Sequence, residues 1–341
     1  MSKYCITMIR GDGVGPELIH SAGLLLDAIG ANSNISFSIK HIDAGDGAVS
    51  KFGKAMPDGA LQIIKNSDAC LKGPIGESAA DVVLVLRQVL DLYANIRPVR
   101  SFPNLRGLSE TIDLVIVREN TEDLYLGWEF EADDNTIITL KRTSEGASRR
   151  IAEYAFRTCG QRNKKKKVVA VHKANVMRRS DGLFARTCRS VSKKFPEIEF
   201  AEQYVDACAM NLIRTPDDYD VIVTTNMFGD ILSDEAIQVA GGIGMGPAGN
   251  IGDDFGLFEP IHGAAFDIAG KNIANPSSIL LSSKLMLEWL AEKKGDAVAF
   301  EEAQKIEHAI RKLLIDNRKT VDIGGSLSTL EFTKAVIDLM Y

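Results

Sequence analysis

The sequence predicts an α/β fold in which helices cover a mostly buried sheet. Short apolar runs rich in β-branched residues alternate with longer stretches of helical spacing, which is typical of strands joined by helices. Three of the apolar runs, at 113–120, 166–175 and 218–230, end in a cluster of polar residues. A length of 341 residues corresponds to about two domains. No linker-like stretch divides the chain, so we expect one domain to be inserted into the other.

The elements follow one another in a regular order. Residues 4–9 form an apolar strand, and Pro16 begins a helix that reaches Ile29 with apolar residues at helical spacing. The expected elements after it are a strand at 36–44, a short helix at 60–66, a strand at 69–76 running into a glycine-rich loop, and helices at 81–93 and 181–195. Pro98 is expected to break regular structure. Residues 128–142 alternate without a helical partner, which predicts a protruding hairpin or an intersubunit arm.

The composition excludes several classes of protein. Hydrophobic residues make up 45% of the chain and charged residues 25%, as in ordinary globular proteins. The formal net charge of −6 argues against nucleic-acid binding, and the basic run Lys164–Lys167 is expected to be a solvated turn. No apolar run is long enough to span a membrane. The five cysteines form no CxxC pair, so we expect a reduced protein of the cytoplasm.

Two glycine-rich segments indicate places where the backbone approaches something closely. GDGVG at 11–15 follows a strand and precedes a helix, but Pro16 and the missing acidic residue distinguish it from the dinucleotide fingerprint GxGxxG. We interpret it as a tight turn. Residues 241–276 have a higher density of glycine, and a long irregular segment of this kind in a compact domain is usually functional.

Three aspartates are candidate metal ligands. Asp230 and Asp234 come just after the apolar run 221–225, and their i,i+4 spacing places both carboxylates on one face of a helix. We expect them at the carboxyl end of a buried strand, where α/β sheets bind ligands. Two hard oxygen donors suit Mg²⁺ or Mn²⁺, and Asp206 is a third candidate. The alternative is a helix N-cap with an acidic residue in the first turn.

Four arginines lie near the ends of expected strands or helices: Arg87, Arg97, Arg100 and Arg118. Guanidinium groups bind carboxylates through two hydrogen bonds, so several together indicate a substrate with more than one carboxylate. The alternative for each is a surface ion pair, most of all for Arg100.

Four further side chains are of the types that transfer protons or bind metals. Tyr125 and Lys173 lie close to strand ends, where they are candidates for an acid and a base, or else are structural. His172 and His262 have no partner at metal-ligand spacing. We therefore expect hydrogen-bonded loop or core histidines there.

Seven segments, in order from residue 11 to 276, carry a resemblance to a known family: GDGVGPE, LRQVLDLYANIRP, VIVRENTEDLY, HKANVMRRSDGLF, VDACAMNL, NMFGDILSDEA and EPIHGAAFDIAGKNIANP. Together they resemble the β-decarboxylating dehydrogenases, a family that includes isopropylmalate, isocitrate and homoisocitrate dehydrogenases. DIGGSLST near residue 322 fits the family's ending, so the resemblance covers nearly the whole chain. GPIGESAADVVLVLRQ and HGAAFDIAGKN are most similar to archaeal-type 3-isopropylmalate dehydrogenases.

The resemblance implies an isopropylmalate dehydrogenase-like fold of two domains with a non-Rossmann NAD site. The cofactor-binding domain would comprise residues 1–94 and 242–341, and residues 95–241 would form the substrate, metal and dimer domain. The resemblance also implies a homodimer, or a tetramer built of such dimers, in which residues 128–142 are the intersubunit arm. The neighbouring subunit would donate Lys173 and Asp206 to the cleft.

The resemblance further implies a role for each candidate residue. Three arginines match the family's ligands for the substrate carboxylates: Arg87, Arg97 and Arg118. Three aspartates match its metal ligands, the first of which also contacts substrate: Asp206, Asp230 and Asp234. Lys173 matches the group that takes the hydroxyl proton, and Tyr125 matches the group that protonates the enolate carbon. In this chemistry the nicotinamide accepts a hydride, and the metal stabilises the enolate left when carbon dioxide departs.

The cofactor site implied by the resemblance lies between His262 and Asn275. Its candidate contacts are His262, Gly263, Ala264, Ala265, Asp267, Ile268 and Asn275. Asp267 falls where an acid accepts hydrogen bonds from the adenosine ribose, and its charge repels a 2′-phosphate, so NAD is expected rather than NADP. The chain departs from many members of the family at Phe266, where they have proline.

The substrate prediction rests on the loop before Arg87. A third carboxylate on the substrate would meet the acidic side chains of Glu77 and Asp81, with Val82 and Val83 nearby. An isopropyl group, in contrast, gains on the order of 2 kcal/mol from apolar burial. We therefore expect 3-isopropylmalate as substrate and 4-methyl-2-oxopentanoate as product, the leucine-biosynthesis step. The alternative for the two valines is that they face the core.

Other functions stay open at this point. Within the family they are isocitrate or homoisocitrate dehydrogenase, a malate- or tartrate-type decarboxylating dehydrogenase, and a non-catalytic regulatory subunit. The last is disfavoured because the metal and acid–base residues are all present. A nucleic-acid-binding role for residues 162–167 is disfavoured by the acidic net charge and the lack of interleaved aromatic residues.

Overall fold

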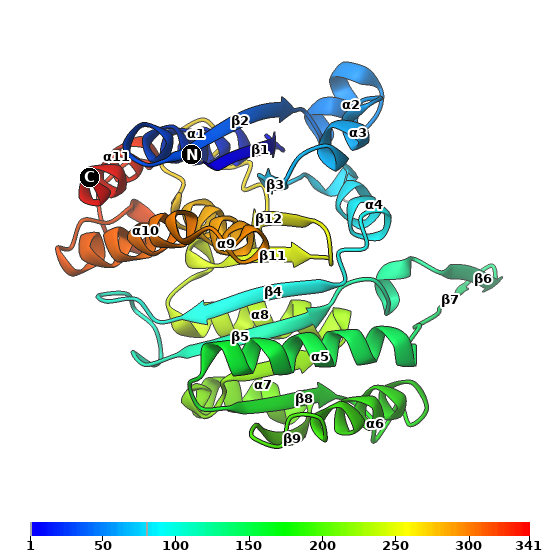
Figure 1. Cartoon of the computed structure of the whole chain (residues 1–341). Helices are drawn as coiled ribbons and strands as arrows, with labels where there is room; N and C mark the ends of the chain where they lie inside the picture. Colours follow the sequence, from blue (N-terminus) through cyan, green and yellow to red (C-terminus); the bar gives the residue numbers. More distant parts are fainter. Residues whose placement is uncertain (1, 80) are drawn as a thin grey trace. The chain divides into compact units, whose positions relative to one another are not determined.

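The computed structural model describes residues 2–79 and 81–341, which form two compact units. Unit 1 consists of the described residues of Met1–Leu90, Phe102–Arg106 and Gly241–Tyr341. Unit 2 consists of Asp91–Ser101 and Gly107–Ala240. Both ends of the chain lie in unit 1 (Figure 1).

The division differs from the predicted boundaries, which placed residues 91–94 in the first domain and residues 102–106 and 241 in the second. Residues 91–94 belong to unit 2, where the first strand of that unit begins. Residues 102–106 belong to unit 1 because Asn104 is hydrogen-bonded there. Its amide donates to the carbonyl of Leu314 at 3.0 Å, and Lys319 Nζ donates to the carbonyl of Asn104 at 2.7 Å.

Unit 1 contains five strands in the order β2-β1-β3-β12-β11. They are β1 (Ser2–Ile9), β2 (Ile35–Ile42), β3 (Ala69–Lys72), β11 (Pro247–Ile251) and β12 (Gly256–Pro260). β1 runs parallel to β2 and β3, and β12 runs parallel to β3, whereas β11 is antiparallel to β12. β3, β11 and β12 are buried along their whole length, which explains why they are short and apolar or glycine-rich.

The described residues of unit 1 form the helices α1 (Gly15–Asn32), α2 (Asp46–Phe52), α3 (Ala60–Lys65), α4 (Asp81–Val89), α9 (Ser277–Lys294), α10 (Ala297–Ile315) and α11 (Thr329–Met340). α1, α9, α10 and α11 pack against one another (Figure 1). Local signals define their ends. Pro16 lies in the first turn of α1, and Ser328 with Glu331 forms a capping box at the start of α11.

Unit 2 has its own run of five strands, in the order β4-β5-β10-β8-β9. They are β4 (Ala94–Arg100), β5 (Asp113–Glu119), β8 (Lys167–His172), β9 (Glu199–Tyr204) and β10 (Val221–Thr224). β5, β10, β8 and β9 are mutually parallel, and β4 is antiparallel to β5. Pro98 was expected to break regular structure, but it lies within β4, opposite Val115 of β5. Proline is tolerated in a strand where its missing N–H is not needed for the ladder.

Four helices cover the two faces of this run: α5 (Glu145–Arg162), α6 (Ser180–Ser192), α7 (Val205–Arg214) and α8 (Asn226–Ala240). α5 packs with α6, and α7 packs with α8 on the other face (Figure 1). β5, β10 and β8 are therefore almost fully buried, and their carboxyl ends lie at one edge of unit 2. Parallel strands bind ligands at such an edge.

Residues 128–142 contain a hairpin of β6 (Glu129–Asp133) and β7 (Thr136–Thr139), which confirms the hairpin alternative of the prediction. Every residue of both strands is exposed. Large apolar side chains are among them, including Phe130 and Ile137. In the described part of the chain, no helix is both long and apolar enough to cross a membrane.

Candidate active site

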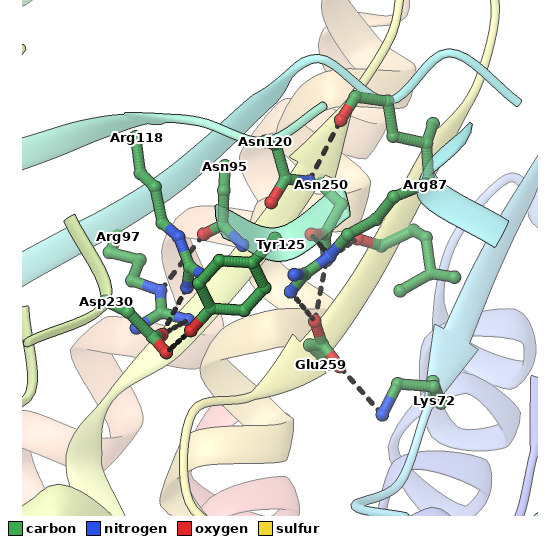
Figure 2. A network of polar contacts seen from close by, with 12 residues as sticks. Lys72, Arg87, Asn95, Arg97, Arg118, Asn120, Tyr125, Asp230, Asn250 and Glu259 are labelled. Atoms are coloured by element: carbon green, nitrogen blue, oxygen red, sulfur yellow. Dashed lines mark hydrogen bonds and ion pairs between the residues drawn. The ribbon is translucent and has the colours of Figure 1, made fainter. Parts of the chain in front are cut away.

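The carboxylate of Asp230 is the centre of a polar cluster in unit 2. Asp230 lies in the second turn of α8, which begins two residues after β10 ends. Arg97 Nη2 lies 3.0 Å from Asp230 Oδ1, and Arg118 Nη1 pairs with the same oxygen. The hydroxyl of Tyr125 donates to Asp230 Oδ2 (Figure 2). Arg97 from β4, Arg118 from β5 and Tyr125 from the segment after β5 therefore all contact Asp230. All four are candidates from the sequence.

The two arginines of this cluster are buried and held by further hydrogen bonds. Arg97 Nε donates to Asn95 Oδ1 at 3.1 Å, and its Nη1 donates to Ser233 Oγ at 2.5 Å. Arg118 is 1% exposed, and its Nε donates to Asn226 Oδ1 at 2.9 Å. Because rotation of both guanidinium groups is restricted, they present fixed donors, which favours binding of a carboxylate of matching geometry.

Gly229 allows Arg118 to lie this close to α8. A Cβ built on Gly229 would stand 2.5 Å from Arg118 Cγ and 2.6 Å from its Cβ, which is closer than real contacts allow. The glycine of NMFGD is therefore required by packing against the Arg118 stem. Alanine at this position would displace either the helix or the guanidinium group.

The cluster offers both positive and negative charge to a ligand. Arg118 Nη2 is buried and has no hydrogen-bond partner among the described residues, so it is suited to an anionic oxygen. Asp234 lies one turn beyond Asp230, and its Oδ1 is 3.4 Å from Arg97 Nη1. Burial raises the pKa of Asp234, and the Arg97 guanidinium opposes that shift. A cation bound here would favour the ionised carboxylate.

Lys173 and Asp206 form a separate pair at the opposite end of the strand run. Lys173 follows β8, Asp206 is in the first turn of α7, and Lys173 Nζ lies 2.6 Å from Asp206 Oδ1. This hydrogen bond holds the pKa of Asp206 below its ordinary value. Among the described residues, no three His, Cys, Asp or Glu side chains are grouped to hold a metal ion. Within one chain, Asp206 therefore does not complete a three-aspartate site with Asp230 and Asp234.

Arg87 belongs to a buried network of unit 1. It lies on α4, and its Nε donates to Asn250 Oδ1 at 3.0 Å, while its Nη2 lies 3.6 Å from Glu259 Oε1. Lys72 Nζ lies 2.7 Å from the other oxygen of Glu259 (Figure 2). Burial alone would raise the pKa of Glu259. The two cations and the Asn250 amide lower it to about 2.

The segment before Arg87 agrees only in part with the predicted contacts to the substrate. Val82 is buried, in agreement with the alternative that it faces the core. Val83 is half-buried, one turn before Arg87 on α4. Glu77 is exposed in a short 3-10 helix, Glu77–Ala79. Of the two valines, Val83 is thus the one available to a ligand.

The predicted cofactor loop is held by contacts with the GDGVG turn. Val14 N–H donates to the carbonyl of Ala264 at 2.8 Å. Gly13 has φ +57°, and a Cβ there would stand 1.9 Å from that carbonyl oxygen, so only glycine fits. Asp12 accepts hydrogen bonds from the backbone N–H groups of three residues outside the turn. GDGVG is therefore the tight turn that the sequence predicted, and in addition it supports the loop.

The residues of the cofactor loop differ in accessibility. Gly263, Ala265 and Asp267 are exposed, whereas Ala264 and Asn275 are buried. Other predicted contacts, Ile268 and His262, are half-buried, and partial burial lowers the pKa of the His262 imidazole. The Asn275 side chain already accepts from Ser277 N–H and donates to Asp322. A structural role in starting α9 is thus evident for Asn275, whether or not it also contacts a ligand.

The structure also reveals supporting residues that the sequence analysis did not single out. They are Lys72, Asn250 and Glu259 around Arg87, and Asn95, Asn226 and Ser233 around the other two arginines. A lysine within the apolar strand ACLK was a usable signal, because an ionised group there must have a partner. Arg100 pairs with Asp113 at 3.3 Å on the surface, as its alternative interpretation predicted.

The chain is similar to known proteins over nearly its whole length. The sequence pattern described as isocitrate/isopropylmalate dehydrogenase matches residues 5–336. The chain belongs to this family. It is 48% identical over 328 residues to 3-isopropylmalate dehydrogenase of Sulfurisphaera tokodaii, with 96% of each chain covered. It is 46% identical to 3-isopropylmalate dehydrogenase of Saccharolobus solfataricus, covering 99% of this chain and 98% of that protein.

The fold agrees with this assignment. A crystal structure of isocitrate dehydrogenase from Methylococcus capsulatus superposes with a TM-score of 0.91 at 38% identity, covering 100% of this chain and 99% of that one. The resemblance seen in the sequence is thereby confirmed, as is the predicted α/β fold class. The family and the names of the relatives indicate a decarboxylating dehydrogenase, and enzymes of this family use a divalent metal and NAD(P).

Proposed function

We propose that the protein is a 3-isopropylmalate dehydrogenase that uses NAD and Mg²⁺ or Mn²⁺ and produces 4-methyl-2-oxopentanoate. The observation that carries the proposal is the cluster of Arg97, Arg118, Tyr125 and Asp230, in which two fixed guanidinium groups adjoin a proton donor and a carboxylate. These are the groups needed to bind a dicarboxylate, protonate a carbanionic carbon and hold a cation. Sequence identity of 46–48% to 3-isopropylmalate dehydrogenases supports the choice of substrate.

The donor set fits a hard divalent cation. Asp230 and Asp234 present carboxylate oxygens one helical turn apart, and their side chains are 36% and 50% exposed, so an ion can reach both. Asp206 of a second copy is proposed as the third ligand, since Asp206 does not join the other two within one chain. When bound, the ion supplies Lewis-acid stabilisation of the negative charge that develops as carbon dioxide leaves.

The side chains of the protein bind the substrate and transfer the protons. Arg97 and Arg118 bind and orient the substrate carboxylates, and Arg87 is proposed as a further ligand for them. Lys173 accepts the proton of the hydroxyl group as the hydride leaves for the nicotinamide. Tyr125 delivers its hydroxyl proton to the carbon that has lost the carboxylate. Holding these groups in place lowers the barrier by removing the entropy cost of orientation, which is worth several kcal/mol.

NAD is proposed to bind along the loop His262–Asn275, with the exposed Asp267 accepting hydrogen bonds from the adenosine ribose hydroxyls. The glycine and alanine backbone of the loop lets the cofactor approach closely. Val83, half-buried one turn before Arg87, is proposed to contact the isopropyl group, and the acidic Glu77 disfavours a third carboxylate nearby.

A homodimer with shared active sites completes the proposal. The exposed apolar hairpin β6–β7 is proposed to clasp the second subunit, which would place Lys173 and Asp206 in the neighbouring site. Five free cysteines fit a reducing cytoplasmic compartment.

Steady-state kinetics test the proposal. kcat/KM is measured for 3-isopropylmalate, isocitrate, homoisocitrate and malate, each with NAD and with NADP at saturating Mg²⁺. We expect 3-isopropylmalate with NAD to be preferred by at least tenfold, which is about 1.4 kcal/mol of transition-state discrimination. A preference for isocitrate or homoisocitrate would refute the substrate assignment. Equal rates with malate would show that the isopropyl group is not recognised.

A further inference from the structure

Lys141 occupies an unusual position between two buried carboxylates of unit 2. Its Nζ lies 2.9 Å from Asp181 Oδ1 and 3.5 Å from Asp123 Oδ1. The side chains of the two aspartates are 0% and 2% exposed, and that of Lys141 is 13% exposed. The ammonium group also faces the ring of Phe228 at 4.8 Å. One ammonium group is thus the shared counter-ion of two acids that water does not reach.

The first of these acids, Asp123, holds the segment that carries Tyr125. Asp123 Oδ1 accepts the N–H of Leu124 at 2.9 Å, at the start of the 3-10 helix Leu124–Leu126. Its Oδ2 accepts the N–H of Met227 at 3.1 Å, in the first turn of α8. Asp123 has φ +76°, a conformation that costs a non-glycine residue on the order of 1–3 kcal/mol and persists only where other contacts enforce it.

The second acid, Asp181, holds Lys173. Asp181 lies in the first turn of α6, and its Oδ2 accepts the backbone N–H of Lys173 at 2.7 Å. Lys173 follows directly after β8, so this hydrogen bond fixes where the chain turns and where the lysine side chain starts. The backbone of the proposed base is therefore tied to the same ammonium group as the segment of the proposed acid.

We propose that Lys141 is a positioning residue for both Tyr125 and Lys173. The inference rests on the proposed function, in which these two residues transfer protons. In the proposed dimer, Tyr125 serves the site of its own chain and Lys173 serves the neighbouring site. Lys141 then connects the two active sites of the dimer through one buried ion triad, Asp123–Lys141–Asp181.

Electrostatics explains why both residues depend on one cation. Without the ammonium group, Asp123 and Asp181 would be buried like charges with no opposite charge between them, a strongly unfavourable arrangement. Each carboxylate would have to move toward water or become protonated, and each movement would shift the backbone it holds. A displacement of about 1 Å at a reacting group lowers the rate about 100-fold.

The proposed interface leads directly into the triad. Lys141 follows the hairpin β6–β7, whose end is held by a hydrogen bond from Leu140 N–H to the Trp128 carbonyl at 2.9 Å. Arg142, the next residue, pairs with Asp123 through a backbone hydrogen bond of 3.0 Å. Seating of the hairpin on a second copy would therefore fix the position of Lys141.

The experiment uses heterodimers purified through two different tags. A dimer of a Tyr125→Phe chain with a Lys173→Met chain contains one complete site, made of Tyr125 from the second chain and Lys173 from the first. Lys141→Met is then added to one chain at a time. When Lys141→Met is placed on the Lys173→Met chain, it perturbs only Tyr125 of the complete site. When Lys141→Met is placed on the Tyr125→Phe chain, it perturbs only Lys173 of that site.

We expect kcat of the complete site to fall about 10- to 100-fold in both arrangements, with KM for 3-isopropylmalate unchanged within about twofold because the arginines are untouched. Exchange of the C3 hydrogens of 4-methyl-2-oxopentanoate with D₂O reports on Tyr125 and should fall only in the first arrangement. Lys141→Arg, which keeps the charge, should recover most of the rate. Lys194→Met, which removes a surface pair with Glu153 in the same unit, is the matched control and should change nothing.

Three results would overturn the inference: an unchanged kcat in either arrangement, equal losses with Lys141→Arg, or equal losses with Lys194→Met. If Lys141→Met does not fold, Asp181→Asn replaces it. That variant keeps an acceptor for the Lys173 N–H but weakens the ion pair, and it should lower kcat only on the chain that supplies Lys173. If the heterodimer without Lys141→Met is inactive, the shared-site dimer is wrong, and the kcat and KM of the Lys141→Met homodimer still decide whether Lys141 positions the two residues.

Discussion

Replacement of Glu259 by glutamine tests the buried network around Arg87. Glu259 Oε2 lies 2.7 Å from Lys72 Nζ, and Oε1 lies 3.6 Å from Arg87 Nη2 and accepts the Asn250 amide at 2.7 Å. Glutamine preserves the volume and one acceptor but removes the charge. Lys72 and Arg87, 3% and 7% exposed, would then both lose the carboxylate of Glu259 as their ion-pair partner.

Two routes give the size of the effect. Burial raises the pKa of Glu259, but Lys72 and Arg87 lower it further, from 4.5 to about 2. A difference of that size between the unfolded and folded states corresponds to about 3 kcal/mol of stability at neutral pH. Removal of one partner from a buried ion pair costs about 3–5 kcal/mol in other proteins. Both routes therefore predict a loss of about 3 kcal/mol for Glu259→Gln.

The sign of the pH dependence follows from the lowered pKa. The unfolded carboxylate takes up its proton near pH 4.5, while the folded one stays ionised until about pH 2. The stabilisation is therefore complete above pH 4.5 and is lost as the pH falls toward 2, with about 1.4 kcal/mol left at pH 3. The difference between wild type and Glu259→Gln should shrink accordingly.

Urea unfolding followed by circular dichroism at pH 7, 5 and 3 measures this difference. Asp58→Asn, which removes an exposed pair with Lys54, is the control and should change stability by less than about 0.5 kcal/mol. The reasoning fails if Glu259→Gln is within about 1 kcal/mol of wild type at pH 7. It also fails if the difference is the same at pH 7 and pH 3.

Four further predictions concern the proposed site and the rest of the chain. Mg²⁺ should tighten binding of 3-isopropylmalate at least tenfold in wild type and not in Asp230→Asn, as measured by calorimetry; equal tightening in both would contradict the assignment of Asp230 as ligand. Asp267→Asn should raise the NADP-to-NAD ratio of kcat/KM about tenfold by removing a like charge, and an unchanged ratio would place the ribose elsewhere. Ile137→Asp, in the exposed hairpin, should shift sedimentation from dimer toward monomer, and an unshifted dimer would exclude the hairpin from the interface. Burial raises the pKa of Cys70 to about 12, so a thiol reagent at pH 8 should modify only the half-buried Cys5 before unfolding; rapid reaction of further thiols would show that the core opens.

Sequence periodicity predicted helices that bury one face against a neighbouring layer of the fold. The helix expected from Pro16 to Ile29 lies within Gly15–Asn32, and the one expected at 181–195 corresponds to Ser180–Ser192. In both, apolar spacing reports directly on the face that packs against a sheet. β4 was missed because Pro98 was given its usual weight as a breaker, whereas its place opposite Val115 is decided by a strand elsewhere in the chain.

The candidate site was predictable to the extent that it follows strand ends. Arg118 is the last residue but one of β5, and Asp230 follows β10, so their convergence is a consequence of parallel neighbouring strands. The residues that hold these groups were not predictable, because they come from distant positions. The sequence around Lys72 does not indicate that Glu259 is its partner. The sequence around Lys141 likewise does not indicate a pairing with Asp123 and Asp181.

Asp230 is the shared partner of the two buried arginines of unit 2. Arg97, Arg118 and Tyr125 all direct donors to this one carboxylate, which offsets the cost of burying the two guanidinium groups. A substrate carboxylate can replace Asp230 as the partner of the guanidinium groups only if Asp230 gains another cation. In the proposed function a divalent ion would be that cation, and it would bind more readily once the arginines no longer compete for Asp230. We therefore expect this exchange of partners to couple metal and substrate binding in both directions.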